Sequence, residues 1–134
     1  GAVFIRQGTA PIFTECNFTN NSSTSSESEY GGGAIYSYER SDPVFNNCTF
    51  NNNTAAGNGG ASYSGQDAKP AYNNCTFSGN YAQKNGGAIY EIQSKPAIYN
   101  CMFLSNIANE GDGGAIYLSS TPGSSINQCN FSND

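Results

Sequence analysis

One short segment, Gly-Gly-Ala-Ile-Tyr, recurs along this chain at a fixed interval, and it limits the possible folds more than any other feature. It stands at residues 32–36, 86–90 and 113–117, and as Gly-Gly-Ala-Ser-Tyr at residues 59–63, with a step of 27 residues from each copy to the next. Residues 1–4, Gly-Ala-Val-Phe, are a fifth copy, 32 residues before its successor. Self-similarity at such a period is the signature of a repeat protein.

A second landmark alternates with the first: a proline, a cysteine five residues later, and a phenylalanine two residues after that. It occurs at Pro11–Cys16, Pro43–Cys48, Pro70–Cys75 and Pro96–Cys101, and without the proline at Ser124–Cys129. Each unit therefore contains three short apolar runs bounded by Gly, Asn, Ser or Pro. Such runs are too short for helices, and their boundaries predict strands.

A repeat of this length with three short strands predicts one coil of a parallel β-helix. We expect an all-β solenoid of about five coils, beginning near residues 1, 32, 59, 86 and 113, in one domain over residues 1–134. The serine-rich residues 20–30 lengthen the first interval and are expected to form a surface loop. Because the sequence starts and stops within a repeat, we expect a fragment or a repeating unit of a longer assembly.

The side-chain period of a strand predicts which columns of residues fill the core. We place two columns inside the helix: Cys16, Cys48, Cys75, Cys101 and Cys129, and Phe18, Phe50, Phe77, Phe103 and Phe131. In the first strand we place isoleucine inward and tyrosine outward, because a tyrosine hydroxyl in so narrow a core would lack a partner. This gives a possible surface aromatic ladder of Phe4, Tyr36, Tyr63, Tyr90 and Tyr117.

The five cysteines suggest either disulfides or a column of free thiols. Side chains stacked at the strand spacing of about 4.8 Å stand further apart than a disulfide prefers, and an odd count leaves one cysteine over. We therefore favour free thiols that act as small apolar residues. With no histidine and no pair of cysteines close in sequence, neither a metal site nor any other cofactor is expected.

Charge and hydropathy exclude two classes of partner. The net charge is −5, and the five basic residues are scattered, so no patch could follow a nucleic-acid backbone. No apolar run reaches the length of about 18 residues that a membrane-spanning helix needs. We expect neither nucleic-acid binding nor a transmembrane segment.

The alternation of Gly-Gly-Ala-Ile with Phe-x-x-Asn resembles the repeats of the polymorphic outer membrane proteins. The matching residues are Gly32–Ile35, Gly86–Ile89 and Gly113–Ile116, with Phe18-Asn21, Phe50-Asn53, Phe77-Asn80 and Phe103-Asn106. This resemblance implies a right-handed parallel β-helix displayed outside the cell, often in adhesion. The chain departs from the pattern at Ser62, which replaces the isoleucine, and it contains no membrane-barrel domain.

Seven Asn-x-Ser/Thr triplets make N-glycosylation a candidate modification in a eukaryotic protein. They begin at Asn17, Asn20, Asn21, Asn47, Asn52, Asn74 and Asn130. Turns favour asparagine in any case, so the triplets also have a purely structural explanation. Asn47 and Asn74 are the strongest candidates, because they lie at the predicted outward corner between the second and third strands.

An enzyme acting on polysaccharides is a third class to weigh, since such enzymes share the β-helix. Their chemistry needs carboxylates gathered on adjacent coils of one face. Here the carboxylates sit at different phases of the repeat and are interpreted as solvated corner charges: Glu39, Asp42, Asp67, Glu91 and Asp112. No catalytic residue is therefore predicted.

The sequence favours a non-enzymatic structural or adhesive repeat module of an extracellular, cell-surface protein, with other surface proteins or carbohydrate as partners. A second hypothesis is a glycosylated filament subunit in which identical units stack end to end, because open end coils expose strand edges. A polysaccharide lyase or hydrolase is the least favoured of the three.

Overall fold

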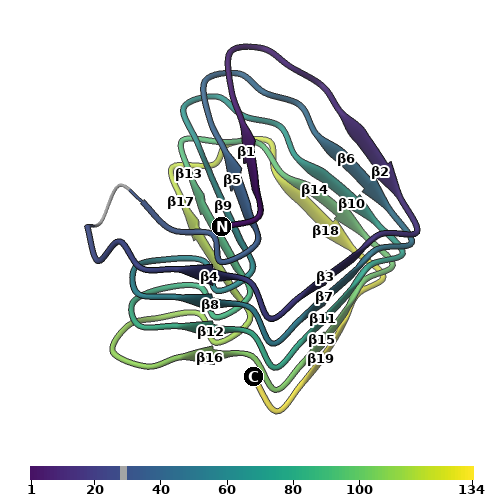
Figure 1. The fold of residues 1–134 in the computed structure, drawn as a ribbon. Helices are drawn as coiled ribbons and strands as arrows, with labels where there is room; N and C mark the ends of the chain where they lie inside the picture. The colour runs from purple at the N-terminus through teal and green to yellow at the C-terminus, as the bar shows by residue number, and fades with distance from the viewer. Residues whose placement is uncertain (28–29) are drawn as a thin grey trace.

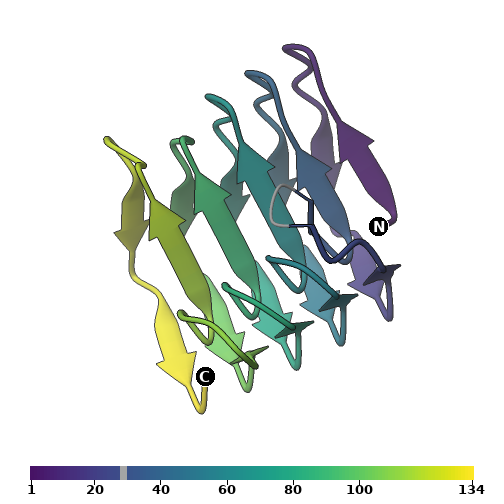
Figure 2. The ribbon, with the colours of Figure 1, turned by 90° about the vertical axis from the view of Figure 1, so that its left-hand side faces the viewer.

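The structure is a computed structural model and describes residues 1–27 and 30–134. This part of the chain is built from strands and turns and contains no helix that could cross a membrane. The strands form four parallel sheets, here called sheets A to D, which run along the length of the molecule (Figures 1 and 2). Sheets A, B and C take one strand from each of the five coils, and sheet D takes one from each of the first four.

The strands are listed by sheet. Sheet A contains β1 (Val3–Ile5), β5 (Ile35–Ser37), β9 (Ser62–Gly65), β13 (Ile89–Ile92) and β17 (Ile116–Ser119). Sheet B contains β2 (Ile12–Thr14), β6 (Val44–Asn46), β10 (Ala71–Asn73), β14 (Ala97–Tyr99) and β18 (Ser125–Asn127). Sheet C contains β3 (Asn17–Thr19), β7 (Thr49–Asn51), β11 (Thr76–Ser78), β15 (Met102–Leu104) and β19 (Asn130–Ser132). Sheet D contains β4 (Ser22–Ser23), β8 (Thr54–Ala55), β12 (Tyr81–Ala82) and β16 (Ile107–Ala108).

Every strand pairs in register with its equivalent in the next coil, so like residues stack on like. Tyr63 pairs with Tyr90, for example, and Phe50 with Phe77. The predicted all-β parallel solenoid with a repeat of 27 residues is therefore confirmed. Two details differ from the prediction. The described residues make four complete turns and three strands of a fifth, and each complete turn has a fourth, two-residue strand.

A column of asparagines stands directly before the fourth strand of each complete turn and holds that strand against the next coil. Asn53 Oδ1 accepts hydrogen bonds from the backbone N–H of Asn21 at 3.0 Å and from its Nδ2 at 2.9 Å. The same pair of bonds joins Asn53 to Asn80, and Asn80 to Asn106. This asparagine ladder locks the backbone of each coil to the next at the point where sheet D begins.

The ladder also changes the interpretation of the serine-rich loop. Within residues 20–30, Ser22–Ser23 form β4 rather than loop, and Asn20 occupies the corner before it with a φ of 57°. The irregular stretch begins after β4, and residues 28 and 29 of the predicted loop lie outside the described residues.

The corners of the coil require left-handed backbone. Between sheets B and C, Asn47, Asn74 and Asn100 have φ values of 52°, 54° and 50°, which asparagine tolerates better than most residues. At the corner before sheet A, Gly86 has a φ of 66°, and an added Cβ would press on the backbone of Ile89. The choice of Asn or Gly at these positions follows from the backbone.

The core is narrow and is filled by stacked columns. Phe50 and Phe77 stack with centroids 4.6 Å apart and rings 3° from parallel, and Phe103 continues the stack. Cys48, Cys75 and Cys101 are buried, whereas Cys16 and Cys129 are half-buried in the end coils. Phe18 is buried and Phe131, in the last coil, is 51% exposed while stacking on Phe103.

All five cysteines are free thiols. Burial raises the pKa of Cys48, so this thiol stays protonated and neutral at physiological pH. The thiols donate weakly to backbone carbonyls; Cys101 Sγ, for example, lies 3.3 Å from the Tyr99 carbonyl oxygen. They behave as small core residues.

Candidate binding groove

The outer face of sheet A carries a continuous column of aromatic rings. The column contains Phe4, Tyr36, Tyr63, Tyr90 and Tyr117, and neighbouring centroids lie 5.3, 5.0, 5.1 and 5.1 Å apart. The isoleucines of the same strands, Ile35 and Ile89, point the other way and belong to the core. The aromatic column thus lies outside the core.

The column is less exposed than the sequence suggests. Tyr63 is only 3% exposed and Tyr90 only 7%, so the interpretation of these two as surface residues is wrong. Each is covered on both sides by neighbouring rings, and Gly31 lets the preceding turn approach so closely that a Cβ there would come within 3.1 Å of the Tyr63 ring. Burial also raises the pKa of Tyr90.

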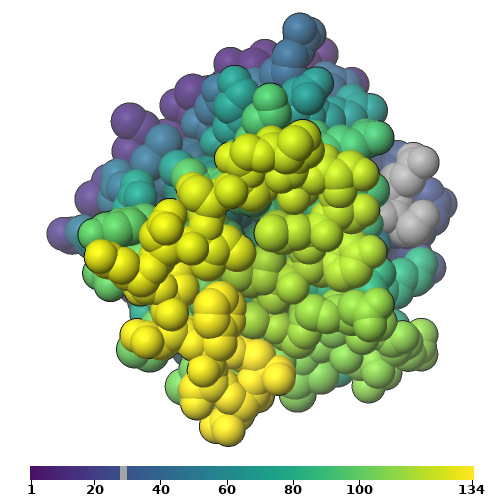
Figure 3. Space-filling model, turned by 180° about the vertical axis from the view of Figure 1, so that it is seen from behind, coloured from purple at the N-terminus to yellow at the C-terminus, as the bar shows by residue number. Residues whose placement is uncertain are grey.

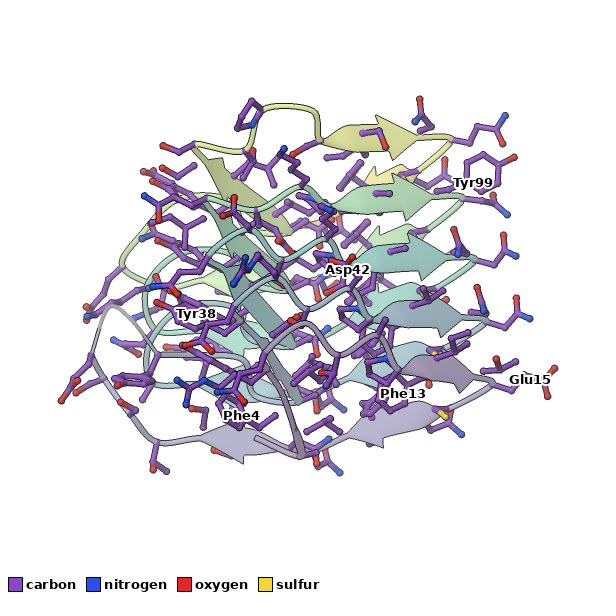
Figure 4. All side chains as sticks on the ribbon, turned by 90° about the horizontal axis from the view of Figure 1, so that it is seen from above. Phe4, Phe13, Glu15, Tyr38, Asp42 and Tyr99 are labelled. Atoms are coloured by element: carbon purple, nitrogen blue, oxygen red, sulfur yellow. The ribbon has the colours of Figure 1, made fainter. Side chains whose placement is uncertain are left out.

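Solvent reaches the column beside Phe4 and Tyr36. There a groove of about 390 Å³ is lined by the rings of Phe4, Tyr30, Tyr36 and Tyr38, beside the guanidinium of Arg6. Phe4 is 65% exposed, and the Tyr36 ring is 5.5 Å from that of Tyr38. Figure 4 shows the labelled Phe4 and Tyr38 side chains on the same side of the molecule, away from the labelled core residue Phe13. We call this the aromatic groove.

An ion pair stands at the edge of the aromatic groove. Arg6 donates two hydrogen bonds to the Glu39 carboxylate, from Nε at 2.8 Å and from Nη2 at 2.7 Å. These bonds raise the pKa of Arg6 and lower that of Glu39, so both groups stay charged. A bidentate pair of this kind has a fixed geometry, because the guanidinium and the carboxylate are both planar.

A second hollow adjoins the ion pair at the corner after sheet A. It has a volume of about 880 Å³ and is lined by Gln7, Gly8, Glu39, Arg40, Gln66, Asp67 and Gln93. We call it the polar hollow. Glu39 lines the polar hollow and its partner Arg6 lines the aromatic groove, so the ion pair connects the two. Sequence periodicity placed Glu39 and Asp67 at different phases, and the structure nevertheless brings them into one depression.

The carboxylate of Glu91 is buried and does not lie at a solvated corner. It was interpreted as a solvated corner charge, but the side chain is fully buried inside the helix. Ser94 Oγ donates to Glu91 Oε2 at 2.7 Å, and burial raises the Glu91 pKa to about 8. The reason is its register: Glu91 pairs with Ser64 in the neighbouring coil, so it follows the inward face of sheet A.

Other buried hydroxyls on the inward side of sheet A pair with one another, while Glu91 Oε1 has no hydrogen-bond partner among the described residues. Ser37 and Ser41 bond to each other at 2.8 Å, and Ser62 bonds to Tyr72 at 2.7 Å. All of these side chains are buried. The polar atoms of this cluster point into the helix, so the cluster is part of the scaffold and is not open to a substrate.

The asparagines of the seven triplets do not share one environment. Six are exposed: Asn17, Asn20, Asn47, Asn52, Asn74 and Asn130. Asn21 differs, because its Nδ2 donates to Asn53 within the asparagine ladder. Asn74 Nδ2 donates to Asn47 Oδ1 at 3.2 Å, so the two strongest candidates form their own ladder on the surface.

The described residues contain no group of three His, Cys, Asp or Glu side chains that could hold a metal ion. The remaining acidic residues are dispersed. Asp42 lies 4.0 Å from Lys69, and Asp112 is exposed beside Asn85.

A family model described as a right-handed β-helix region matches residues 1–134. No curated protein and no solved structure matches the chain.

Proposed function

Because this chain belongs to the right-handed β-helix family, we propose that it is a non-enzymatic structural and adhesive repeat module of an extracellular, cell-surface protein. The observation that carries the proposal is the aromatic groove, in which four rings meet beside a fixed ion pair on the outside of a rigid scaffold. Exposed aromatic residues gathered in one place are typical of binding surfaces.

The scaffold supports this role because its interior is held together by contacts between its own repeated side chains. The phenylalanine stack, the thiol column and the asparagine ladder repeat from coil to coil and leave the outer faces free to vary. In the fourth coil, outward positions that are polar in the neighbouring coils become Met102 and Leu104, which are both more than one-third exposed. A surface that varies on a constant frame suits recognition of partners.

Kinship with the polymorphic outer membrane proteins is part of the same proposal. It is supported by the alternation of glycine pairs at the corner before sheet A with Phe-x-x-Asn, whose asparagine forms the ladder. An adhesive role outside the cell follows from this kinship by analogy.

N-glycans at Asn47 and Asn74 fit the proposed location. Both side chains are exposed at a corner, so a sugar there would extend away from the core. Two adjacent coils place these amides one strand spacing, about 4.8 Å, apart, and their mutual hydrogen bond would compete with modification of both. In a eukaryotic cell we therefore expect one of the two to be modified in any one molecule, which peptide-mapped mass spectrometry with and without N-glycan removal would measure.

Adhesion itself is tested with beads coated with the 134-residue chain and applied to cell layers or matrix. The expected result is retention that survives moderate salt, since packing against the aromatic rings does not depend on charge pairs that salt screens. Beads coated with the Phe4→Ala variant should be retained less, and Tyr99→Ala beads provide a matched surface-aromatic control. Retention no greater than that of albumin-coated beads would contradict the adhesive proposal.

A filament is the second candidate, and the columns favour it. The phenylalanine stack runs from Phe18 to Phe131, and the ladder runs from Asn21 to Asp134, whose Oδ1 accepts from Asn106 Nδ2 at 2.7 Å. A second copy placed in register on the end coil seen in Figure 3 would continue both columns. Electron microscopy of concentrated protein should then show rods, and Phe131→Asp should remove them; discrete particles at all concentrations would exclude this candidate.

A polysaccharide lyase or hydrolase remains the least favoured candidate. Its best support is the polar hollow, which holds Glu39 and Asp67 together with Arg40. Glu39 is already engaged by Arg6, which leaves it poorly suited to abstract a proton. Incubation with polygalacturonate and with neutral glycans, followed by analysis of chain length, should show no cleavage.

A further inference from the structure

We propose that the aromatic groove binds a neutral pyranose unit of a polysaccharide, and that the polar hollow accepts the adjoining unit. This inference rests on the proposed adhesive function and names the ligand class of the same surface. Three properties support it: the arrangement of the rings, the balance of charge, and the contact between the two depressions.

The rings provide a surface for the apolar side of a sugar. A pyranose has one face of C–H groups, and an aromatic ring offers the flat, partly negative surface on which C–H groups pack well. Phe4 and Tyr36 are 5.3 Å apart and tilted by 41°, and Tyr36 and Tyr38 are tilted by 33°. The three rings thus form a curved wall rather than a flat stack. The volume of about 390 Å³ lies within the range of small-molecule sites.

The charges favour a neutral ligand. Arg6 faces the aromatic groove but is neutralised by Glu39, and the polar hollow adds Arg40 and Asp67, one charge of each sign. A quaternary ammonium ion would meet the guanidinium at the wall of its ring cage, although such cages otherwise suit cations. An anionic sugar would meet the carboxylates of Glu39 and Asp67, which offset the attraction of Arg6 and Arg40. A neutral sugar is repelled neither by the guanidinium groups nor by the carboxylates.

The polar groups suit hydroxyls, which both donate and accept. Arg6 uses two of its N–H groups on Glu39 and has further donors, while the carboxylate retains lone pairs. Beyond the pair, the polar hollow presents the amide side chains of Gln7, Gln66 and Gln93 from the first, third and fourth coils. Because the ion pair forms the boundary of both depressions, one chain of linked sugars can lie across it.

The test is titration of the 134-residue chain with cellohexaose, maltohexaose and chitohexaose, followed by isotope-edited NMR. Expected are saturable shifts at Phe4, Arg6, Tyr38 and Gln66 with at least one neutral hexamer. Phe4→Ala should weaken that binding by about tenfold, which is about 1.4 kcal/mol. Phe4 is exposed, so this variant should fold; Tyr99→Ala, on another face, should bind as the parent does. Arg6→Gln, which keeps a donor but breaks the ion pair, should also weaken binding.

Several results would overturn the inference: no shift with any neutral hexamer, equal loss in Phe4→Ala and Tyr99→Ala, or binding restricted to hexagalacturonate or to choline. The bead assay separates this failure from that of the adhesive function. If beads adhere but neutral hexamers neither bind nor compete, the adhesive proposal stands and the ligand class is wrong. If beads fail to adhere while a hexamer binds at the groove, the sugar site stands without adhesion.

Discussion

The Tyr72 hydroxyl lies 2.7 Å from the Ser62 hydroxyl in the centre of the β-helix, and both residues depart from the repeat. Tyr72 replaces the phenylalanine found at the paired position 45, and Ser62 replaces the isoleucine found at positions 35 and 89. A tyrosine in this core needs a partner for its hydroxyl, and a serine there needs one as well. Each departure therefore compensates for the other.

This pairing predicts strong coupling between the two positions. Tyr72→Phe leaves the Ser62 hydroxyl unpaired, and Ser62→Ile crowds the Tyr72 hydroxyl, so each single change should cost about 1–3 kcal/mol of unfolding free energy. The double variant restores the repeat pattern and should cost less than the sum. Urea unfolding of all four proteins measures this cycle, and additive costs would show that the two side chains act independently.

Loss of a buried asparagine from the ladder should lower the free energy of unfolding far more than loss of an exposed asparagine. Asn80→Ala leaves the Asn53 N–H and the Phe50 carbonyl without side-chain partners, at about 1–3 kcal/mol for each buried group. Asn127→Ala, at an exposed position of sheet B, should change stability by less than about 0.5 kcal/mol. Comparable losses for the two variants in chemical unfolding would mean that the ladder is not a stabilising feature.

The raised pKa of Glu91 predicts that the free energy of unfolding falls as the pH rises. Its pKa is about 8 in the folded chain against an ordinary value of 4.5, so the folded state holds this proton over a range in which the unfolded state has released it. The contribution is fully present below pH 4.5 and is lost as the pH rises towards and through 8, at up to about 1.4 kcal/mol per pH unit.

Glu91→Gln keeps the shape of the side chain and removes its titration. Denaturant unfolding between these two pH values should therefore give a flatter profile for the variant than for the parent. Parallel profiles would indicate that the carboxyl titrates normally, and hence that water reaches it.

A comparison of Gly86 with Gly123 distinguishes the cost of a left-handed backbone from the cost of a steric clash. Gly86 and Gly123 both have positive φ values, 66° and 86°, but a Cβ at Gly86 would press on the backbone of Ile89, whereas a Cβ at Gly123 would have nothing within 4 Å. Replacement by alanine should cost about 1–2 kcal/mol for the conformation alone at Gly123 and clearly more at Gly86. Thermal unfolding compares the two, and equal costs would leave no role for the close approach.

Most of the scaffold could be predicted because a solenoid repeats its own pattern. Cys-x-Phe fixed the inward face of sheet C, and asparagine at positions 47, 74 and 100 identified a left-handed corner. The fourth strand was missed because two residues carry no periodicity. Its signal was the asparagine three residues after each phenylalanine, which the sequence displays but whose burial is decided by contacts between coils.

The groove could not be derived from the sequence in the same way. Tyr63 and Tyr36 stand at the same phase of the repeat, and only the packing of neighbouring turns makes one buried and the other half-buried. Likewise, the bidentate bond from Arg6 to Glu39 joins two residues of adjacent coils that share no motif.

The burial of Glu91 could not be predicted either, because acidic residues are rarely buried. Its hydrogen bond from Ser94 depends on the fold and has no signal in the sequence.

The asparagine ladder also governs how such a molecule can change over generations. An insertion or deletion within a strand would move its inward-facing residues out of line with their columns, whereas a change that adds or removes an entire coil would keep every column in phase. The five extra residues of the first interval lie between β4 and Gly32, and the columns continue in phase beyond them. Between strands the count of residues can differ without loss of the columns: Asn53 and Asn80 of the ladder are 27 residues apart, whereas Asn80 and Asn106 are 26 apart.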